Sequence, residues 1–264
     1  MIVIKNEEQI ARIAKACEVA GHMLDELRGV IKPGMSTKDI DRWVEDYILK
    51  HDQKPAFKGY GGFPACACVS VNEEIIHGIP SKKKILKEGD LVKVDLGTIY
   101  KGYYSDAART YPVGKVTEEN SKLMQVAEES FFEGIKFARE GNRIGDIGHA
   151  IQSCVEAAGF SVIRDYTGHG VGEDMHEDPA VPNYGKPGHG PKLVKGMCIA
   201  VEPMIAAGDW KIRVLDNDWT VVTRDGSMTA HYENTIIITD GDPLILTCFD
   251  RKTDAQLPEK EGSC

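Results

Sequence analysis

The sequence lacks the features that mark membrane, secreted and nucleic-acid-coating proteins. It has no run of about 18 uncharged apolar residues, the length that a membrane-spanning helix requires. Its start carries Lys5, Glu7 and Glu8 and no apolar segment, so we expect no signal peptide. Basic residues are outnumbered, 32 Lys and Arg against 41 Asp and Glu, which argues against a broad phosphate-binding surface. We therefore expect neither a membrane nor DNA as a partner.

A cysteine pattern typical of a disulfide framework is also absent. The seven cysteines are odd in number and irregularly spaced, which favours free thiols in a reducing compartment. We therefore expect a cytoplasmic protein. The chain does have enough apolar sequence, 42% against 28% charged residues, to build a sizeable core in one large globular domain.

The chain repeats itself once. Four short motifs recur in the same order about 100 residues apart, a period too long for a solenoid. In both copies of the longest motif an acidic residue, Asp95 or Glu202, ends an apolar strand six positions after a glycine. This predicts a single domain over 1–250 with half-repeats of about 1–115 and 116–250, and a polar tail over 251–264. The paired motifs are Gly34-x4-Asp39-Ile40 with Gly141-x4-Asp146-Ile147, Gly59-Tyr60-Gly61 with Gly168-His169-Gly170, His77-x-x-Pro80 with His176-x-x-Pro179, and Leu86–Asp95 with Leu193–Glu202.

Each half is predicted to be two helices followed by antiparallel strands, an α+β arrangement. Apolar residues at helical spacing predict a first helix around 10–27, and Ser36 with Asp39 three residues on predicts the start of a second that runs to about Lys50. Pairing the halves would give a curved sheet with helices over one face. The remaining expected helices are 118–139 and 145–158, and the expected strands are 66–72, 91–99, 103–113, 161–166, 197–205, 210–215, 219–224 and 229–238.

Four acidic residues are expected to meet where the two halves pack together: Asp95, Asp106, Glu202 and Glu233. Two ionised carboxylates 4 Å apart repel by roughly 4 kcal/mol at an effective dielectric constant near 20. The cluster must therefore hold protons, disperse into solvent or bind cations. Two divalent ions would balance four charges, and His169 between two glycines could add a nitrogen ligand.

This donor set is rich in hard oxygen ligands, which favours Mn²⁺, Fe²⁺ or Co²⁺, with Zn²⁺ also possible. Paired ions of this kind polarise a carbonyl or phosphoryl group and hold a nucleophilic hydroxide. The alternative is that each acidic residue is an ordinary solvated group at a strand end. Only the recurrence of Val94-Asp95 as Val201-Glu202 favours the metal interpretation.

His77 and His176 hold equivalent positions in the two halves, so we expect both at the rim of the acidic cluster. Single histidines are more often hydrogen-bonded structural residues. A symmetry-related pair beside a charged cluster is a better candidate for handling substrate and protons.

These residues together resemble the type I methionine aminopeptidases. The resemblance implies the pita-bread fold, with two halves related by a pseudo-two-fold axis and a curved antiparallel sheet covered by helices on one face. It implies removal of the initiator methionine from nascent chains with a small second residue, through attack of a metal-bridging water or hydroxide on the first peptide bond. It extends from about Ile4 to Leu246 and rests on Asp95, Asp106, His169, Glu202 and Glu233 together with Asn72–Pro80, Gly168–Gly172, His176–Pro179 and Val201–Met204.

The resemblance also implies a role for each acidic residue. Asp95 would bind one metal ion, and His169 and Glu202 would bind the other. Asp106 and Glu233 would bridge the two ions. Glu202 would in addition accept a proton from the attacking water.

The same resemblance assigns the substrate contacts. His176 would hydrogen-bond the carbonyl oxygen, and His77 would contact the scissile amide nitrogen. Ordinary core packing is the alternative for Cys68 and Met175. The chain departs from the pattern at Phe57, where some members have cysteine, and at Gly97, where some have threonine. The methionine pocket maps to Tyr60, Phe63, Cys68, His77, Met175, His176 and Trp219.

Two further features concern ions and partners. The resemblance places a monovalent cation, Na⁺ or K⁺, on backbone oxygens at Asn72, Glu74 and Thr229, and it implies a monomer. The one dense basic run, Lys82–Lys84 with Lys87, is either a solvated loop or a contact with ribosomal RNA. The implied substrate is the N-terminus of a nascent polypeptide.

Two rival functions stay open. An Xaa-Pro aminopeptidase or prolidase shares the fold but usually has an additional N-terminal domain, whereas only about 90 residues precede Asp95 here. A non-catalytic pita-bread binding module typically lacks some of the ligands, whereas all five are present in this sequence.

Overall fold

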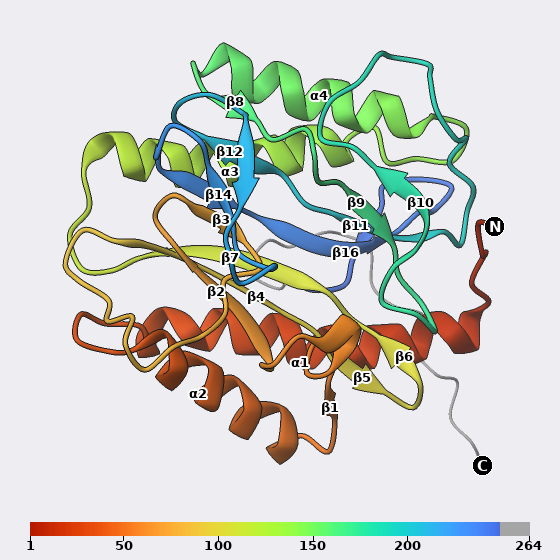
Figure 1. The fold of residues 1–264 in the computed structure, drawn as a ribbon. Coiled ribbons are helices and arrows are strands. Elements are labelled where there is room, and N and C mark those ends of the chain that lie inside the picture. The colour runs from red at the N-terminus through yellow and green to blue at the C-terminus, as the bar shows by residue number, and fades with distance from the viewer. Residues whose placement is uncertain (249–264) are drawn as a thin grey trace.

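The computed structural model describes residues 1–248, so the expected polar tail over 251–264 lies outside the described residues. A curved antiparallel sheet crosses the centre of the molecule, with one pair of helices along each side (Figure 1). No helix within residues 1–248 is long and apolar enough to cross a membrane. The α+β class is therefore confirmed. The helices are α1 (Glu7–Val30), α2 (Thr37–Lys50), α3 (Glu118–Ile135) and α4 (Ile144–Ala157).

The helix starts follow from local capping. The Ser36 side chain accepts a hydrogen bond from the Asp39 backbone N–H at 3.2 Å, and the Asp39 carboxylate accepts from the Ser36 N–H at 2.9 Å. The predicted start of α2 is thus confirmed. Helix α3 ends at Ile135, earlier than the expected residue 139. Its last turn lies so close to α4 that a Cβ on Gly134 would come within 2.6 Å of Ile151.

The main sheet has eight strands and draws on both halves of the sequence. Its order is β10-β9-β11-β16-β7-β4-β2, with β17 paired to β16. The strands are β2 (Ala67–Val71), β4 (Leu91–Leu96), β7 (Ala107–Pro112), β9 (Gly168–Gly170), β10 (Glu177–Val181), β11 (Cys198–Val201), β16 (Glu233–Ile237) and β17 (Leu244–Ile245).

Three small sheets surround the main one. Each has three strands. They are β1 (Lys54–Pro55), β5 (Thr98–Tyr100) and β6 (Tyr103–Tyr104); β8 (Ser161–Val162), β12 (Met204–Ala206) and β15 (Thr229–His231); and β3 (Glu74–Ile76), β13 (Ile212–Val214) and β14 (Val221–Thr223).

The two halves meet at the pair β7–β16, where Glu233 lies opposite Ala108. Strand β4 flanks this pair on one side and β11, the strand with the equivalent motif, on the other. Gly34 N–H donates to the Leu86 carbonyl at 2.8 Å, and Gly141 N–H donates to the Leu193 carbonyl at 3.0 Å. Equivalent bonds at equivalent motif positions support the predicted duplication.

Apolar residues hold the helices against the sheet. Leu24 of α1 and Val44 of α2 share a buried cluster with Val92 of β4. A second cluster joins Phe131 of α3 to Ile199 of β11. These two layers leave the strand ends at the sheet centre free to present polar side chains.

Several expected strands were wrong because they were drawn too long. The segment 91–99 breaks at Gly97, where a Cβ would lie 2.3 Å from the Ser105 carbonyl oxygen. The segment 197–205 breaks at Pro203, which has no N–H to donate to a sheet. The segment 161–166 keeps only two strand residues, β8. Segments 103–113 and 229–238 each split in two, and β1, β3, β9, β10 and β17 were not expected.

Candidate functional site

The broken strands bring four carboxylates together at the sheet centre. Asp95 lies in β4 and Glu233 begins β16, while Asp106 directly precedes β7 and Glu202 directly follows β11. All four residues are at most 9% exposed. The sheet thus places four acidic groups in an environment where full ionisation requires compensation.

The imidazole of His169 lies against this cluster. Its Nε2 atom is 3.5 Å from an Asp106 carboxylate oxygen and 3.6 Å from a Glu202 oxygen. Its Nδ1 atom is 2.9 Å from the Gly170 carbonyl oxygen, so Nδ1 carries the proton and donates it there. The lone pair of Nε2 is therefore directed at the carboxylates, the arrangement that a metal-ligating histidine has.

Burial changes the protonation of the whole group. It raises the pKa of Asp95 and of Glu202 well above their ordinary values, and repulsion from Asp106 adds to both shifts. The pKa of Glu233 is raised for the same two reasons. Burial raises the pKa of Asp106 to about 7 and lowers the pKa of His169. A cluster in this state releases protons when cations bind, because ligating carboxylates must be ionised.

The donor atoms fit a pair of divalent cations. Among residues 1–248, the buried oxygens Asp95 Oδ1, Asp106 Oδ1 and Glu233 Oε1 have no hydrogen-bond partner. Buried carboxylate oxygens without a hydrogen-bond partner are suited to ligate a cation. Potential ligand atoms form two sets, and within each set all atoms lie within 4.8 Å of one another. One set is Asp95, His231 and Glu233, and the other is Asp106, His169 and Glu233. Glu233 belongs to both sets, Asp106 belongs to one, and Glu202 belongs to neither.

The sequence interpretation missed His231. Its side chain is 1% exposed, and neither ring nitrogen has a hydrogen-bond partner within residues 1–248. The Nε2 atom is 3.6 Å from a Glu233 oxygen and 3.8 Å from a Glu202 oxygen. Its position two residues before Glu233 was the available signal, because residues at that spacing share one face of a strand.

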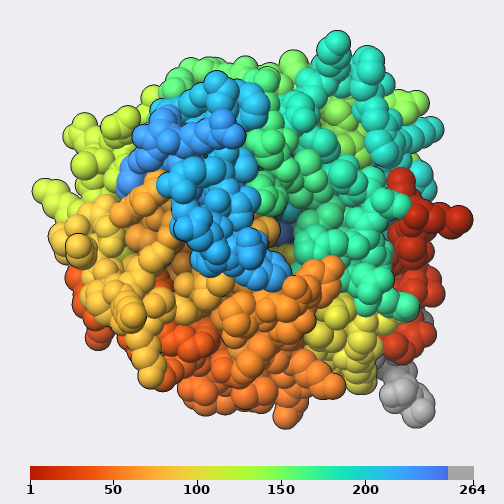
Figure 2. All heavy atoms as spheres, in the orientation of Figure 1, coloured from red at the N-terminus to blue at the C-terminus, as the bar shows by residue number. Residues whose placement is uncertain are grey.

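The acidic cluster forms one wall of a cavity of about 380 Å³. Figure 2 shows the surrounding segments, orange, blue and teal, meeting around a hollow in this face of the molecule. Apolar and sulfur-bearing side chains line the opposite wall. The cavity contains all five predicted metal ligands and every predicted substrate contact, namely Tyr60, Phe63, Cys68, His77, Met175, His176 and Trp219.

The histidine pair lies at the cavity as expected from the repeat. His176 Nδ1 is 2.8 Å from the Tyr60 hydroxyl oxygen, and its ring centre is 4.2 Å from that of His169. His77 packs edge-on against Tyr166 and Trp219 and has a left-handed backbone, with φ of 57°. Loss of hydration in the cavity wall lowers the pKa of each imidazole to about 4, so both are neutral at pH 7.

The two departures from the family pattern lie against each other. A Cβ on Gly97 would lie 2.3 Å from the Ser105 carbonyl oxygen and 3.1 Å from both Phe57 Cε1 and Ala56 Cβ. The Ser105 backbone and the Phe57 ring together leave no room for a threonine side chain at position 97. Phe57 itself lines the cavity, so the exchange changes the shape of one wall and leaves the carboxylates in place.

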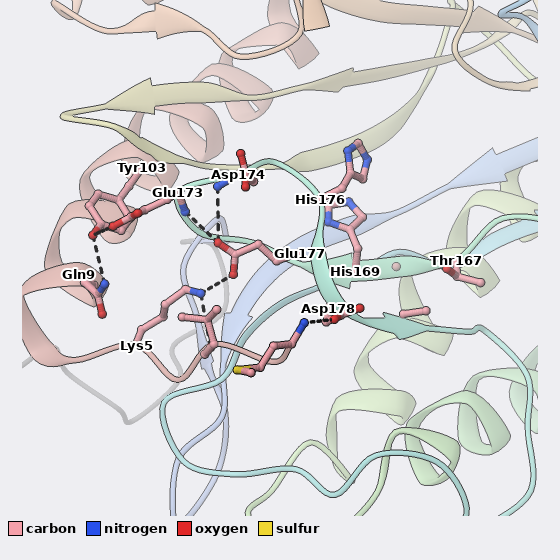
Figure 3. Close-up of a pocket in the computed structure, with 14 residues that line it drawn as sticks. Lys5, Gln9, Tyr103, Thr167, His169, Glu173, Asp174, His176, Glu177 and Asp178 are labelled. Carbon is pink, nitrogen blue, oxygen red and sulfur yellow. Dashed lines mark hydrogen bonds and ion pairs between the residues drawn. The ribbon is translucent and has the colours of Figure 1, made fainter. Parts of the chain in front are cut away.

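A second hollow of about 690 Å³ opens beside the cavity and shares Thr167, His169 and His176 with it. Figure 3 shows the Lys5 ammonium joined to Glu177, which also accepts a hydrogen bond from the Glu173 N–H at 2.9 Å. Lys5 is 5% exposed. The amino-terminal segment thus holds the loop that carries His176.

The residues proposed for a monovalent cation also lie together. Thr229 Oγ1 is 2.7 Å from the Asn72 carbonyl oxygen and 3.1 Å from the Glu74 carbonyl oxygen. A fourth group, the Lys93 ammonium, donates to the Asn72 carbonyl at 2.7 Å. Sequence reasoning did not single out Lys93.

Comparison with known proteins gives concordant results. The profile of metallopeptidase family M24 matches residues 11–240. A methionine aminopeptidase of Clostridium acetobutylicum is 55% identical over 247 residues, which are 94% of this chain and 99% of the relative. The crystal structure of a Thermotoga maritima methionine aminopeptidase superposes with a TM-score of 0.93 at 49% identity, covering 94% of this chain and 100% of that one.

More distant structures share the fold over a smaller part of their length. The Pyrococcus furiosus prolidase superposes with a TM-score of 0.77 at 25% identity, and the match covers 94% of this chain but 66% of the prolidase. The high-identity relatives, in contrast, match almost end to end. The chain belongs to metallopeptidase family M24 and, within it, to the methionine aminopeptidases.

Proposed function

We propose that this chain removes the N-terminal methionine from peptides and nascent proteins whose second residue is small, with two divalent metal ions, Mn²⁺, Fe²⁺, Co²⁺ or Zn²⁺, as cofactors. The observation that carries this proposal is the convergence of five potential ligands on one wall of a cavity whose other wall is apolar. Membership in a metallopeptidase family agrees with the use of divalent metal.

The five predicted ligands would hold the ions, with Asp95 on one side, His169 and Glu202 on the other, and Asp106 and Glu233 between. When bound, the two ions would lower the pKa of a water molecule that serves as the nucleophile, and they would polarise the scissile carbonyl. Glu202 would accept the proton of the attacking water. The high proton affinity of this buried carboxylate suits it to that task.

The two neutral histidines would act on the peptide itself. A neutral His176 that accepts from the Tyr60 hydroxyl at Nδ1 carries its proton on Nε2. That proton can be donated to the carbonyl oxygen and more strongly to the developing oxyanion. His77 would contact the leaving nitrogen from the opposite loop.

The cavity wall suits an unbranched thioether side chain. Phe63 and Trp219 meet edge to face with ring centres 5.1 Å apart, and Cys68 and Met175 are buried beside Phe63. Sulfur–aromatic contact stabilises a bound methionine by on the order of 1 kcal/mol.

An assay with matched peptides tests the proposal. We expect methionine release from Met-Ala-Ser, much slower release from Met-Leu-Ser, and no cleavage of Ala-Pro-Ser. Release should stop after treatment with a chelator and return with Mn²⁺ or Co²⁺. Cleavage of the Ala-Pro peptide would favour the prolidase-type alternative, and an inert protein with both metals bound would favour a non-catalytic binding module.

The basic run is a possible contact for the ribosome, from which nascent substrates emerge in the cytoplasm. Lys82, Lys83 and Lys87 are exposed, whereas Lys84 pairs with Glu74. We expect replacement of the three exposed lysines by alanine to reduce co-sedimentation with ribosomes at low salt, because phosphate contacts are electrostatic. A matched variant in which Lys115, Lys186 and Lys192 are replaced by alanine has the same net charge as the first variant. It should bind ribosomes as the parent does. Equal co-sedimentation of the two variants with ribosomes would contradict the proposed contact.

We expect the chain to act as a monomer, as its resemblance to the type I methionine aminopeptidases implies. Size-exclusion chromatography with light scattering measures this directly.

A further inference from the structure

A lysine is buried beneath the candidate site. Lys93 lies in β4 two residues before Asp95 and is 1% exposed. An ammonium taken out of water loses several kcal/mol of hydration unless polar groups replace it. Lys93 must therefore have a compensating environment within the protein.

Backbone carbonyls and carboxylates provide that environment. The Lys93 Nζ donates to the Asn72 carbonyl at 2.7 Å. The carboxylates of Glu74 and Glu73 are near enough to attract this ammonium electrostatically. The ammonium thus lies among carbonyl and carboxylate oxygens at the turn between β2 and β3.

This pocket is where a free Na⁺ or K⁺ was expected, and the residues present do not fit one. The Asn72 carbonyl is contacted by Lys93 Nζ at 2.7 Å, by Thr229 Oγ1 at 2.7 Å and by the Thr229 N–H at 3.2 Å. Three donors already share the two lone pairs of this oxygen, and the Lys93 ammonium is one of them, so the position that an additional ion would take is occupied. The expectation of a free monovalent cation at this site is therefore not supported.

We propose that the Lys93 ammonium is a covalently attached substitute for a free monovalent cation. Through Asn72 and Thr229 it ties together three segments that carry candidate site residues. Strand β4 carries Asp95, β3 leads into His77, and β15 leads into Glu233. Lys93 is accordingly a positioning residue, and the assembly of the site does not depend on Na⁺ or K⁺ in solution.

The thermal stability of the full chain in different salts tests this. The parent protein should have the same Tm in NaCl, KCl and choline chloride at equal ionic strength, since choline is too large for a carbonyl pocket. Lys93→Asn removes the ammonium and frees the carbonyl. In choline chloride the Tm of this variant should be lower than that of the parent. Millimolar Na⁺ or K⁺ should raise the variant's Tm saturably by about 5 °C, because a ligand that binds only the folded state stabilises that state.

Two control variants separate charge from packing. Lys93→Met keeps the length of the side chain without the charge and should be destabilised equally in all three salts. Lys93→Arg keeps the charge and should remain insensitive to the cation. Binding of Co²⁺ to the Lys93→Asn variant, followed by its visible absorption, should tighten when K⁺ is added, because the segments that carry the ligands are then held in place.

The outcomes are decisive in both directions. A saturable rise of the parent Tm with Na⁺ or K⁺ would overturn the proposal, as would a Lys93→Asn variant that has the same Tm in every salt. If Lys93→Asn folds in none of the salts, the parent titration alone decides. Neither measurement uses peptide cleavage, so failure here is distinguishable from failure of the proposed function.

Discussion

Glu202→Gln is expected to lower kcat for Met-Ala-Ser by about 100-fold or more. Glutamine keeps the size and one oxygen of the side chain, but it cannot accept a proton from water. Glu202 is 8% exposed and its oxygen lies 3.6 Å from His169, so no solvent group can easily take its place. Steady-state kinetics at saturating Mn²⁺, with the metal content of the variant measured alongside, provide the check.

The metal content distinguishes two causes of a slow variant. If the variant retains both ions and is slow, it has lost the proton acceptor. If it has lost an ion, its slow turnover is explained by weaker metal binding instead. Glu173→Gln is a suitable control, because Glu173 is exposed at the neighbouring hollow and should leave kcat within a few-fold of the parent value. Near-normal turnover by Glu202→Gln with both ions bound would rule out the assigned role.

His176→Ala is expected to raise the activation barrier by roughly 2–4 kcal/mol, or about 30- to 900-fold in kcat, with a smaller effect on KM. The loss is concentrated in kcat because a hydrogen bond to the oxyanion is stronger in the transition state than in the bound substrate. Tyr60→Phe removes the hydroxyl 2.8 Å from Nδ1 and should give a smaller loss in the same parameter.

A remote histidine serves as the control for that measurement. His189 is exposed, and its Nδ1 lies 3.0 Å from the carbonyl oxygen of Pro187 two residues away, so His189→Ala should behave as the parent. An effect of His176→Ala that is confined to KM would contradict the oxyanion role.

The helices were the most predictable part of the fold because their start signals are local. Ser36 and Asp39 form the reciprocal bonds that their spacing predicts, and Asp146 accepts from the Arg143 N–H at 2.7 Å in the equivalent position of the second half. The end of α3 was less predictable, because it depends on close packing against α4 rather than on a local signal.

The strand-bearing segments were located better than the strands were counted or bounded, since eight expected segments correspond to only part of the 17 strands within residues 1–248. Segments such as 91–99 and 229–238 mix apolar and polar residues without a clear interruption, so periodicity cannot show that each one leaves one sheet and enters another. The breaks fall at Gly97 and beside Glu233, where tertiary contacts redirect the chain. Strand β9 is three residues of Gly168–Gly170, a composition that has little strand propensity and pairs only because β11 and β10 flank it.

The acidic cluster could be predicted because a repeated motif doubles the information in a single sequence. Asp95 and Glu202 mark equivalent strand ends, and the fold brings both to the central pair of strands. His231 lies outside the repeated motifs, and Lys93 lies inside one but is matched by Ala200 at the equivalent position, so the repeat does not single out either residue. Their importance depends on burial and on partners more than 20 residues away in the sequence, which only the structure supplies.

The exchange at Phe57 and Gly97 has a consequence for inhibitor selectivity. An electrophilic compound directed at a cysteine in this wall finds an aromatic ring instead, whereas a flat heterocycle can stack on it. The remaining thiol in the cavity, Cys68, is a poor target because burial raises its pKa well above the ordinary value, so the reactive thiolate is scarce. Non-covalent aromatic scaffolds are therefore the better starting point for ligands selective for this protein.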